Sequence, residues 1–274
     1  KLVDESDIDM ILVGDSLGMT MLGYHGTVGV TLDDMIYHAK HVVKGAPNTF
    51  VIGDMPFGTY NVSIEEAVRN ANKLFMESGC DCIKLEGGSD MAPVIKAIVK
   101  AGIPVCAHIG LTPQSAAMMG GFKVQGKSLE AAQELLDSAR AVEEAGAFMV
   151  VLEGIPKMLA DVITEKLSIP TMGIGAGAGC DMQVLVAQDM LGMNEWVPKF
   201  VKKYADLHKI IIDAYNQYVK ESGAGPGHHP LRAHARAGRQ GQPHHQPVGR
   251  HRPAFGGQER AHPGSCSREI RGGH

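Results

Sequence analysis

The 274-residue sequence lacks a long hydrophobic run, a secretory pattern and a cysteine framework. None of its apolar runs approaches the ~18–20 residues needed to cross a bilayer. No charged-then-apolar signal pattern opens the chain. Its five cysteines show no paired spacing, which argues against a disulfide scaffold and suits a reducing compartment. We therefore expect a cytoplasmic protein with one sizeable core.

The formal net charge of the chain is also small, at −4. It is unevenly spread. From Ser222 onward eight arginines face two glutamates, so a basic tail follows an acidic body. An acidic body gives no electrostatic reason to expect nucleic acid as a partner, and no membrane partner is expected either.

The composition changes at the start of this tail. Residues 222–274 are rich in Gly, Pro, His, Arg and Gln and contain only four large apolar residues. Such a segment buries too little apolar surface to offset the entropy of ordering, so we predict a disordered tail. Its two histidine pairs could be metal ligands, but no cysteine or acid pattern surrounds them. The predicted organisation is a catalytic domain over 1–221 and a tail over 222–274.

The body alternates short apolar runs with amphipathic helical segments. Apolar runs that are bounded by Gly or Pro predict strands buried on both faces, as in a parallel sheet. Seven runs qualify: 10–13, 50–54, 82–86, 105–109, 148–152, 171–174 and, more weakly, 184–187. Helices are predicted over 35–44, 63–78, 91–100, 128–145, 157–167 and 202–220, with Thr31 or Asp33, Ser63 and Ser128 as N-caps. This alternation predicts a parallel α/β fold.

Ionisable side chains recur where the predicted strands end. They are Asp15, Asp54, Glu86, His108 and Glu153. Ligands bind at the carboxyl ends of parallel strands. A ring brings successive strand ends together, whereas a doubly wound sheet spreads them apart, so we expect a TIM-type (β/α)8 barrel. Such a barrel needs one strand more than the seven runs provide. The absent strand would be the first of the fold, so we expect an opening in the barrel beside the run 10–13.

Three of these residues suggest a metal. Asp15, Asp54 and Glu86 offer hard oxygen ligands, and Mg²⁺ is commonly held by one or two carboxylates, waters and substrate oxygens. The alternative is that each acid caps the next helix. Capping explains any one of them well, but all three together favour metal binding.

Three further residues suggest work on a substrate. Lys84 shares a strand face with Glu86, so it can bind an anion, although a lysine stem can also extend to solvent. His108 alone is as well explained by a satisfied core histidine. Glu153 is bounded by apolar residues, and partial desolvation makes a carboxylate a better base.

Seven motifs together resemble the ketopantoate hydroxymethyltransferase (3-methyl-2-oxobutanoate hydroxymethyltransferase) family. They are Asp15–Met19, Asp54–Phe57, Lys84–Gly88, His108–Gln114, Gly120–Gly126, Leu152–Pro156 and Gly173–Gly177. The resemblance runs in order from about Asp9 to Lys220. It implies a barrel of the phosphoenolpyruvate/isocitrate-lyase kind, lacking here its first strand and most of its first helix, and usually assembled as a homodecamer.

The resemblance also implies a reaction and a role for each site residue. The family transfers a hydroxymethyl unit from 5,10-methylenetetrahydrofolate to 3-methyl-2-oxobutanoate, giving 2-dehydropantoate, in pantothenate (coenzyme A) biosynthesis. The implied roles are Mg²⁺ surroundings for Asp15, Asp54 and Glu86, contact with the keto acid for Ser16, Lys84 and His108 as well as Asp15 and Asp54, and catalytic base for Glu153.

Two other functions stay open at this point. One is another Mg²⁺-dependent lyase on the same barrel, acting on a carboxylate substrate without folate. The His108–Gln114 and Gly120–Gly126 motifs argue against it. The other is an inactive chain that binds substrate or joins an assembly without turnover.

Overall fold

The computed structural model describes residues 1–224. Residues 1–214 form one compact unit, and a second unit begins at Tyr215, of which only the end of the last helix is described. The predicted disorder of the tail, with its histidine pairs, falls almost wholly outside the described residues and stays a prediction.

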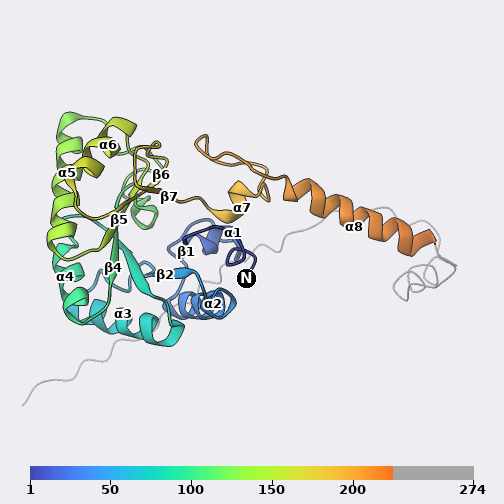
Figure 1. The fold of residues 1–274 in the computed structure, drawn as a ribbon, viewed down its shortest axis with the longest axis horizontal. Coiled ribbons are helices and arrows are strands. Elements are labelled where there is room, and N and C mark those ends of the chain that lie inside the picture. Colours follow the sequence, from blue (N-terminus) through green and yellow to red (C-terminus); the bar gives the residue numbers. More distant parts are fainter. Residues whose placement is uncertain (225–274) are drawn as a thin grey trace, which may run out of the picture. The chain divides into compact units, whose positions relative to one another are not determined.

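The first unit is built on one parallel sheet whose strands follow one another in sequence order. The sheet curls into an open barrel, as predicted from the strand ends (Figure 1). Its strands are β1 (Met10–Val13), β2 (Phe50–Asp54), β3 (Cys82–Glu86), β4 (Val105–Gly110), β5 (Met149–Glu153), β6 (Thr171–Ile174) and β7 (Met182–Gln183). Within the described chain, β1 pairs only with β2 and β7 only with β6, so the expected opening beside β1 is present.

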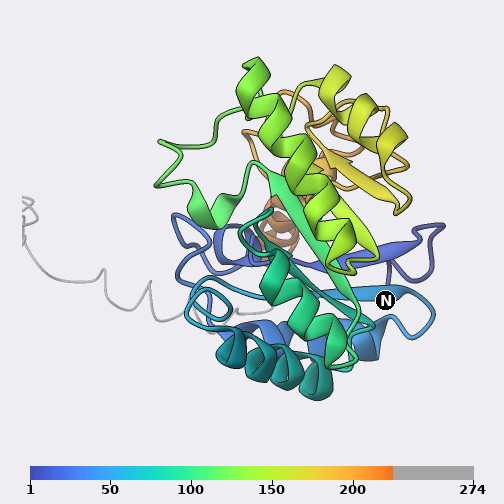
Figure 2. The ribbon, with the colours of Figure 1, turned by 90° about the vertical axis from the view of Figure 1, so that its left-hand side faces the viewer.

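The helices of the described chain are α1 (Leu17–Thr20), α2 (Leu32–Gly45), α3 (Ile64–Ser78), α4 (Ala92–Lys100), α5 (Leu129–Glu144), α6 (Lys157–Lys166), α7 (Ala187–Met190) and α8 (Leu207–Ala224), with a 3₁₀ turn at Pro113–Ser115. Helices α2 to α6 connect successive strands and lie along the outside of the curled sheet (Figures 1 and 2). None of the described helices combines the length and apolar character that a membrane span requires.

Polar caps fix where the long helices begin. The Thr31 hydroxyl accepts the Asp34 N–H while the Asp34 carboxylate accepts the Thr31 N–H, which is a complete capping box at α2. Ser63 and Ser128 cap α3 and α5 in the predicted way. At α3 the reciprocal bond, in which the Ser63 N–H would donate to the Glu66 carboxylate, is not present, so the capping box that the pair Ser63 and Glu66 predicts is only half formed.

Because successive side chains of a strand point to opposite faces of the sheet, the apolar strand residues divide between two cores. Alternate strand residues pack with the helices in the larger core. The other face of the sheet contributes a core made of strand residues: Ile52, Cys82, Cys106, Met149, Val151 and Met172. The residues that lie two or four positions further along these strands share the inward face with this core, and they are Asp54, Lys84, Glu86, His108 and Glu153. The same inward face is therefore apolar at the bottom and ionisable at the carboxyl end.

The prediction for the seventh strand was wrong in position. The strand is Met182–Gln183 rather than 184–187, and Ala187 begins the short helix α7. The Asp181 carboxylate accepts hydrogen bonds from the N–H and hydroxyl of Thr171, which begins β6. This contact sets the residues directly after Asp181 alongside β6, ahead of the more apolar run.

The last helix also differs from its prediction, because it begins at Leu207 rather than at residue 202. The residues before it use their polar groups elsewhere. The Tyr204 N–H donates to the Met190 carbonyl, and the Lys203 ammonium donates to the carbonyls of Asn194 and Glu195. Tertiary contacts thus replace the first helical turn that periodicity predicted.

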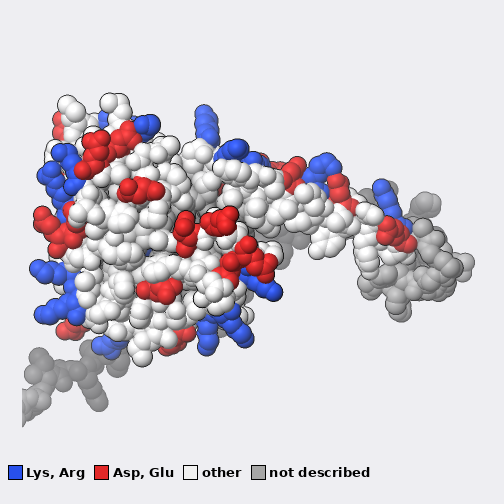
Figure 3. Space-filling model, in the orientation of Figure 1, with Lys and Arg blue, Asp and Glu red and all other residues white. Residues whose placement is uncertain are grey.

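Exposed charges of both signs are interspersed over the described surface that faces the viewer in Figure 3. The long charged side chains of this face point to solvent, in contrast to the buried ionisable groups at the strand ends.

We predict that Gly110→Ala is strongly destabilising. Gly110 has φ +97°, and an added Cβ would lie 2.3 Å from the Glu153 carbonyl oxygen, which belongs to the neighbouring strand. Strain of this kind costs at least about 1–3 kcal/mol. Urea unfolding of the full chain measures it.

The matched control is Gly26→Ala, since an added Cβ there meets nothing within 4 Å. Its unfolding free energy should change by no more than about 0.5 kcal/mol. Equal effects of the two substitutions would contradict the close approach of β4 and β5.

Candidate active site

Four ionisable side chains meet at the carboxyl ends of β1, β2 and β3, and we call them the carboxylate–lysine cluster: Asp15, Asp54, Lys84 and Glu86. Each is at most 4% exposed. The Lys84 ammonium lies 2.8 and 2.9 Å from the two Asp54 carboxylate oxygens and 3.5 Å from Glu86 Oε1. The structure thus brings together, around one ammonium, acids that the sequence placed on separate strand ends.

Asp15 reaches the cluster through the turn that follows β1. Its backbone N–H donates to Asp54 Oδ2 at 3.0 Å, so the chain after Gly14 is tied to the end of β2. Ser16 follows and occupies the N-cap position of α1, yet its side chain makes no capping hydrogen bond. The Ser16 hydroxyl, half-buried beside the cluster, is therefore available to a ligand.

The cluster holds three carboxylates against one ammonium. Burial raises the pKa of Asp54 to about 7, opposed by the Lys84 ammonium and reinforced by the charges of Asp15 and Glu86. Burial lowers the pKa of Lys84, but the three carboxylates outweigh it and raise that pKa well above its usual range. The lysine therefore stays charged, while burial, reinforced by the neighbouring carboxylates, destabilises the ionised form of Asp54.

His108 and Glu153 extend the cluster along β4 and β5. His108 Nε2 lies 3.3 Å from Glu153 Oε2, and Nδ1 lies 3.7 Å from Glu86 Oε1. Both ring nitrogens are buried, and neither makes a hydrogen bond of good geometry within the described chain. Glu153 is the more open residue, with 18% of its side chain exposed. An imidazole between two carboxylates, one facing the mouth of the barrel, is able to hold or pass a proton.

Two residues complete this network without a role predicted from the sequence, Gln114 and Tyr60. The Gln114 side chain donates to Asp15 Oδ2 at 2.9 Å, and its backbone N–H donates to Glu86 Oε2 at 3.0 Å. The Tyr60 hydroxyl donates to Gln114 Oε1 at 2.5 Å. Gln114 closes a motif that pointed to this site, whereas Tyr60 carries no local signal, because it sits in a loop after β2.

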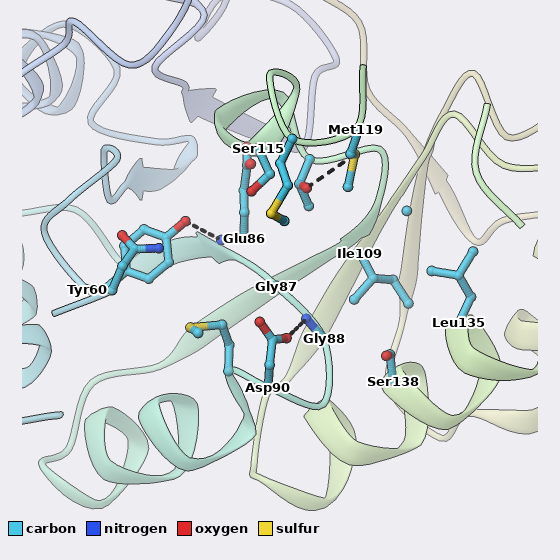
Figure 4. Close-up of a pocket in the computed structure, with 15 residues that line it drawn as sticks. Tyr60, Glu86, Gly87, Gly88, Asp90, Ile109, Ser115, Met119, Leu135 and Ser138 are labelled. Atoms are coloured by element: carbon cyan, nitrogen blue, oxygen red, sulfur yellow. Dashed lines mark hydrogen bonds between the residues drawn. The ribbon is translucent and has the colours of Figure 1, made fainter. Parts of the chain in front are cut away.

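A cavity of about 200 Å³ lies beside the cluster (Figure 4). It is bounded by the ends of β3 and β4, by the loop that carries Ser115 and Met119, and by Leu135 and Ser138 of α5. Glu86 and Tyr60 border it, while Asp15, Asp54 and Lys84 do not. Asp15, Asp54 and Lys84 instead contact one another and Gln114 through hydrogen bonds.

The donor set suits a hard divalent cation. Carboxylate oxygens are the ligands that Mg²⁺ prefers, and a cation of charge two would balance the excess negative charge of the cluster. Among residues 1–224, however, no group of three or more His, Cys, Asp or Glu side chains is arranged to hold a metal ion. Since Mg²⁺ commonly needs only one or two carboxylates, the residues fit it, and the metal role of Asp15, Asp54 and Glu86 stays a prediction.

Comparison with known proteins gives a consistent result. A family model described as ketopantoate hydroxymethyltransferase matches residues 1–227. The chain is 60% identical over 230 residues to the 3-methyl-2-oxobutanoate hydroxymethyltransferase of Heliobacterium modesticaldum, covering 83% of each chain. It is 56% identical over 230 residues to the enzyme of that name from Enterococcus faecalis, covering 83% of this chain and 84% of the relative.

Solved structures show the fold. A 2,3-dimethylmalate lyase, a member of the PEP mutase/isocitrate lyase superfamily, matches with TM-score 0.50 and 17% identity, over 87% of this chain and 84% of the lyase. Phosphonopyruvate hydrolase matches with TM-score 0.51 and 13% identity, over 87% of this chain and 89% of the hydrolase. The predicted (β/α) barrel fold is confirmed.

We predict that Lys84→Met destabilises the protein in a pH-dependent way. The variant leaves Asp54 and Glu86 buried without their cation, which costs about 3–5 kcal/mol at about pH 8. Burial makes the folded Asp54 carboxyl hold its proton to higher pH than the unfolded one, so acidification stabilises the folded variant. The loss should therefore shrink between about pH 8 and about pH 5. Urea unfolding across this range measures it.

Lys96→Met on the exposed side of α4 is the control, and we expect it to change stability little at any of these pH values. A pH-independent loss in Lys84→Met would contradict the charge balance described here.

Proposed function

Because the chain belongs to the ketopantoate hydroxymethyltransferase family, we propose that it transfers a hydroxymethyl group to 3-methyl-2-oxobutanoate to give 2-dehydropantoate. The proposed donor is 5,10-methylenetetrahydrofolate, and the proposed setting is pantothenate and coenzyme A biosynthesis. The names and the identity of the relatives support the activity. The structural observation that carries the proposal is a buried lysine among three carboxylates, with a carboxylate and an imidazole beside them.

The proposed cofactor is Mg²⁺, held by Asp15 and Asp54 with Glu86 nearby. When bound, it supplies Lewis acidity toward the keto and carboxylate oxygens of the substrate. The excess negative charge of the cluster and the hard character of its oxygens support this assignment.

Lys84 is suited to stabilise the negative charge that develops on the substrate. Its ammonium is fixed by Asp54 and Glu86 and shielded from water, so it needs no reorganisation when the enolate oxygen forms. The Ser16 hydroxyl and the His108 ring are the further contacts we propose for the keto acid, since each has a polar atom without a hydrogen-bond partner of good geometry among the described residues.

Glu153 is the proposed base, which removes the proton from C3 of the keto acid. It stands at the end of β5 where the cluster meets solvent, so its carboxylate can reach a bound substrate while the fixed strand orients it. His108 Nε2, 3.3 Å away, positions the carboxylate. The enolate carbon then bonds to the methylene carbon of the folate while the two bonds from that carbon to folate nitrogens break. One water molecule supplies the hydroxyl group and one proton, and the proton taken by Glu153 supplies the other, so tetrahydrofolate leaves with both nitrogens protonated.

A folate-independent lyase finds no support in the comparisons. The solved structures that resemble the chain include a lyase, but at 17% identity that likeness shows the fold alone. Supplying the keto acid and Mg²⁺ with and without the folate separates the two functions, since only the transferase needs the donor to change the substrate's carbon skeleton.

We also propose a homo-oligomer, a decamer as the resemblance implies, in the cytoplasm. Four cysteines of the described chain are buried free thiols, which supports a reducing compartment. Sedimentation of the full chain and fractionation of its cells test these two proposals.

We predict that Glu153→Gln keeps the fold but slows exchange of the C3 hydrogen of 3-methyl-2-oxobutanoate with deuterated water. An amide of the same shape does not accept the proton, and a positioned base is worth roughly 10²–10⁴-fold. Exchange isolates this step from folate chemistry. Glu134→Gln, on the exposed side of α5, should exchange at the normal rate. Undiminished exchange in Glu153→Gln would show that another residue is the base.

We predict that removal of divalent metal with a chelator stops turnover and that Mg²⁺ restores it. Asp54→Asn should need a higher Mg²⁺ concentration for the same restoration, because a neutral amide is a weaker ligand than a carboxylate. Turnover assays across a Mg²⁺ titration measure both effects. Full turnover in the presence of excess chelator would rule out the metal.

A further inference from the structure

We infer that Gln114 is a positioning residue that orients the carboxylates of Asp15 and Glu86, with Tyr60 fixing the direction of its amide. The inference rests on the proposed function for the use of these carboxylates. It rests on geometry for the contacts themselves. Gln114, Tyr60, Asp15 and Glu86 are each at most 4% exposed, so no solvent competes for their hydrogen bonds.

The side-chain amide of Gln114 uses all of its donors. Its NH₂ group donates to Asp15 Oδ2 at 2.9 Å and to the Met55 carbonyl at 3.0 Å. Its oxygen accepts the Tyr60 hydroxyl at 2.5 Å. One side chain from the loop after β4 therefore ties together the turn after β1 and the end of β2, across 99 residues of sequence in the first case.

The direction of this amide is determined. If its oxygen and nitrogen were exchanged, the oxygen would face the Asp15 carboxylate and the Met55 carbonyl, which are both acceptors. The Tyr60 hydroxyl accepts the Glu86 N–H at 3.2 Å, and so its own proton is directed at Gln114. Tyr60 thus selects the amide orientation that presents N–H groups to Asp15.

The backbone of Gln114 completes the arrangement. Its N–H donates to Glu86 Oε2 at 3.0 Å from the 3₁₀ turn Pro113–Ser115. Gln114 therefore donates hydrogen bonds to one oxygen of Glu86 and one oxygen of Asp15. The other Glu86 oxygen faces Lys84 at 3.5 Å, and Asp15 Oδ1 makes no hydrogen bond with any described residue. Asp15 is thus left with one oriented oxygen for a cation or substrate, while the second oxygen of Glu86 is held toward Lys84 and His108.

The first test compares Mg²⁺ binding to full-length variants by calorimetry, with Mg²⁺ alone and with Mg²⁺ plus 3-methyl-2-oxobutanoate. Gln114→Met keeps the length of the side chain and removes both N–H donors. We expect its Mg²⁺ affinity to fall about 10–100-fold, the usual effect of losing a partner that orients a ligand. Tyr60→Phe keeps the ring, removes only the hydroxyl and should weaken binding less. It also provides a folded variant if Gln114→Met does not fold.

Thr171→Val is the matched control. Thr171 is fully buried and hydrogen-bonded to Asp181, but it begins β6 and so lies at the opposite end of the barrel. This variant should lose stability and keep the Mg²⁺ affinity of the parent. An unchanged affinity in both Gln114→Met and Tyr60→Phe, or an equal fall in Thr171→Val, would overturn the inference.

A second test needs neither metal nor substrate. Gln114→Met and Asp15→Asn are combined in a thermodynamic cycle on urea unfolding. If Gln114 holds Asp15, the double variant should lower the folding equilibrium constant by a smaller factor than the product of the factors measured for the two single variants. Independent effects would overturn the inference. Coupled effects in a parent chain that binds no Mg²⁺ would instead uphold the positioning role and overturn the proposed metal.

Discussion

One buried ammonium surrounded by three buried carboxylates is the constraint on which the site depends. Unpaired buried charges are costly, and five of the six carboxylate oxygens accept a hydrogen bond from a described residue. The donors come from separate parts of the chain: the Lys84 side chain, the Asp15 N–H and the amide groups of Gln114. Because these donors belong to two strand ends and one loop, satisfying the carboxylates also fixes the top of the barrel.

The two-residue period of the strands explains how one sheet makes both a core and a site. On β3, Cys82, Lys84 and Glu86 share the inward face, and only the first lies in the apolar core. The packed core below prevents the strand ends from moving, which keeps the ionisable groups in place before any ligand arrives. Electrostatic stabilisation of an enolate needs such preorganised charge.

Sequence reasoning found the residues that strand periodicity places, and missed those that loops place. Asp54 and Glu86 follow directly from apolar runs, so their proximity was predictable. Tyr60 and Gln114 were not assigned roles, because the path of a loop depends on tertiary contacts that no local pattern records. The same reason explains the seventh strand, where a hydrogen bond from Thr171 to Asp181 outweighed the more apolar run.

The central claim is that the cluster carries more negative charge than its lysine balances and that a divalent cation corrects this. The most direct measurement is the titration of ¹³C-labelled aspartate carboxyls by NMR, with Asp54→Asn identifying the Asp54 signal. Without metal, the pKa of Asp54 should lie near the value of about 7 that burial produces. With Mg²⁺ it should fall, because the cation favours the carboxylate. A pKa of Asp54 in the ordinary aspartate range, unchanged by Mg²⁺, would contradict the account.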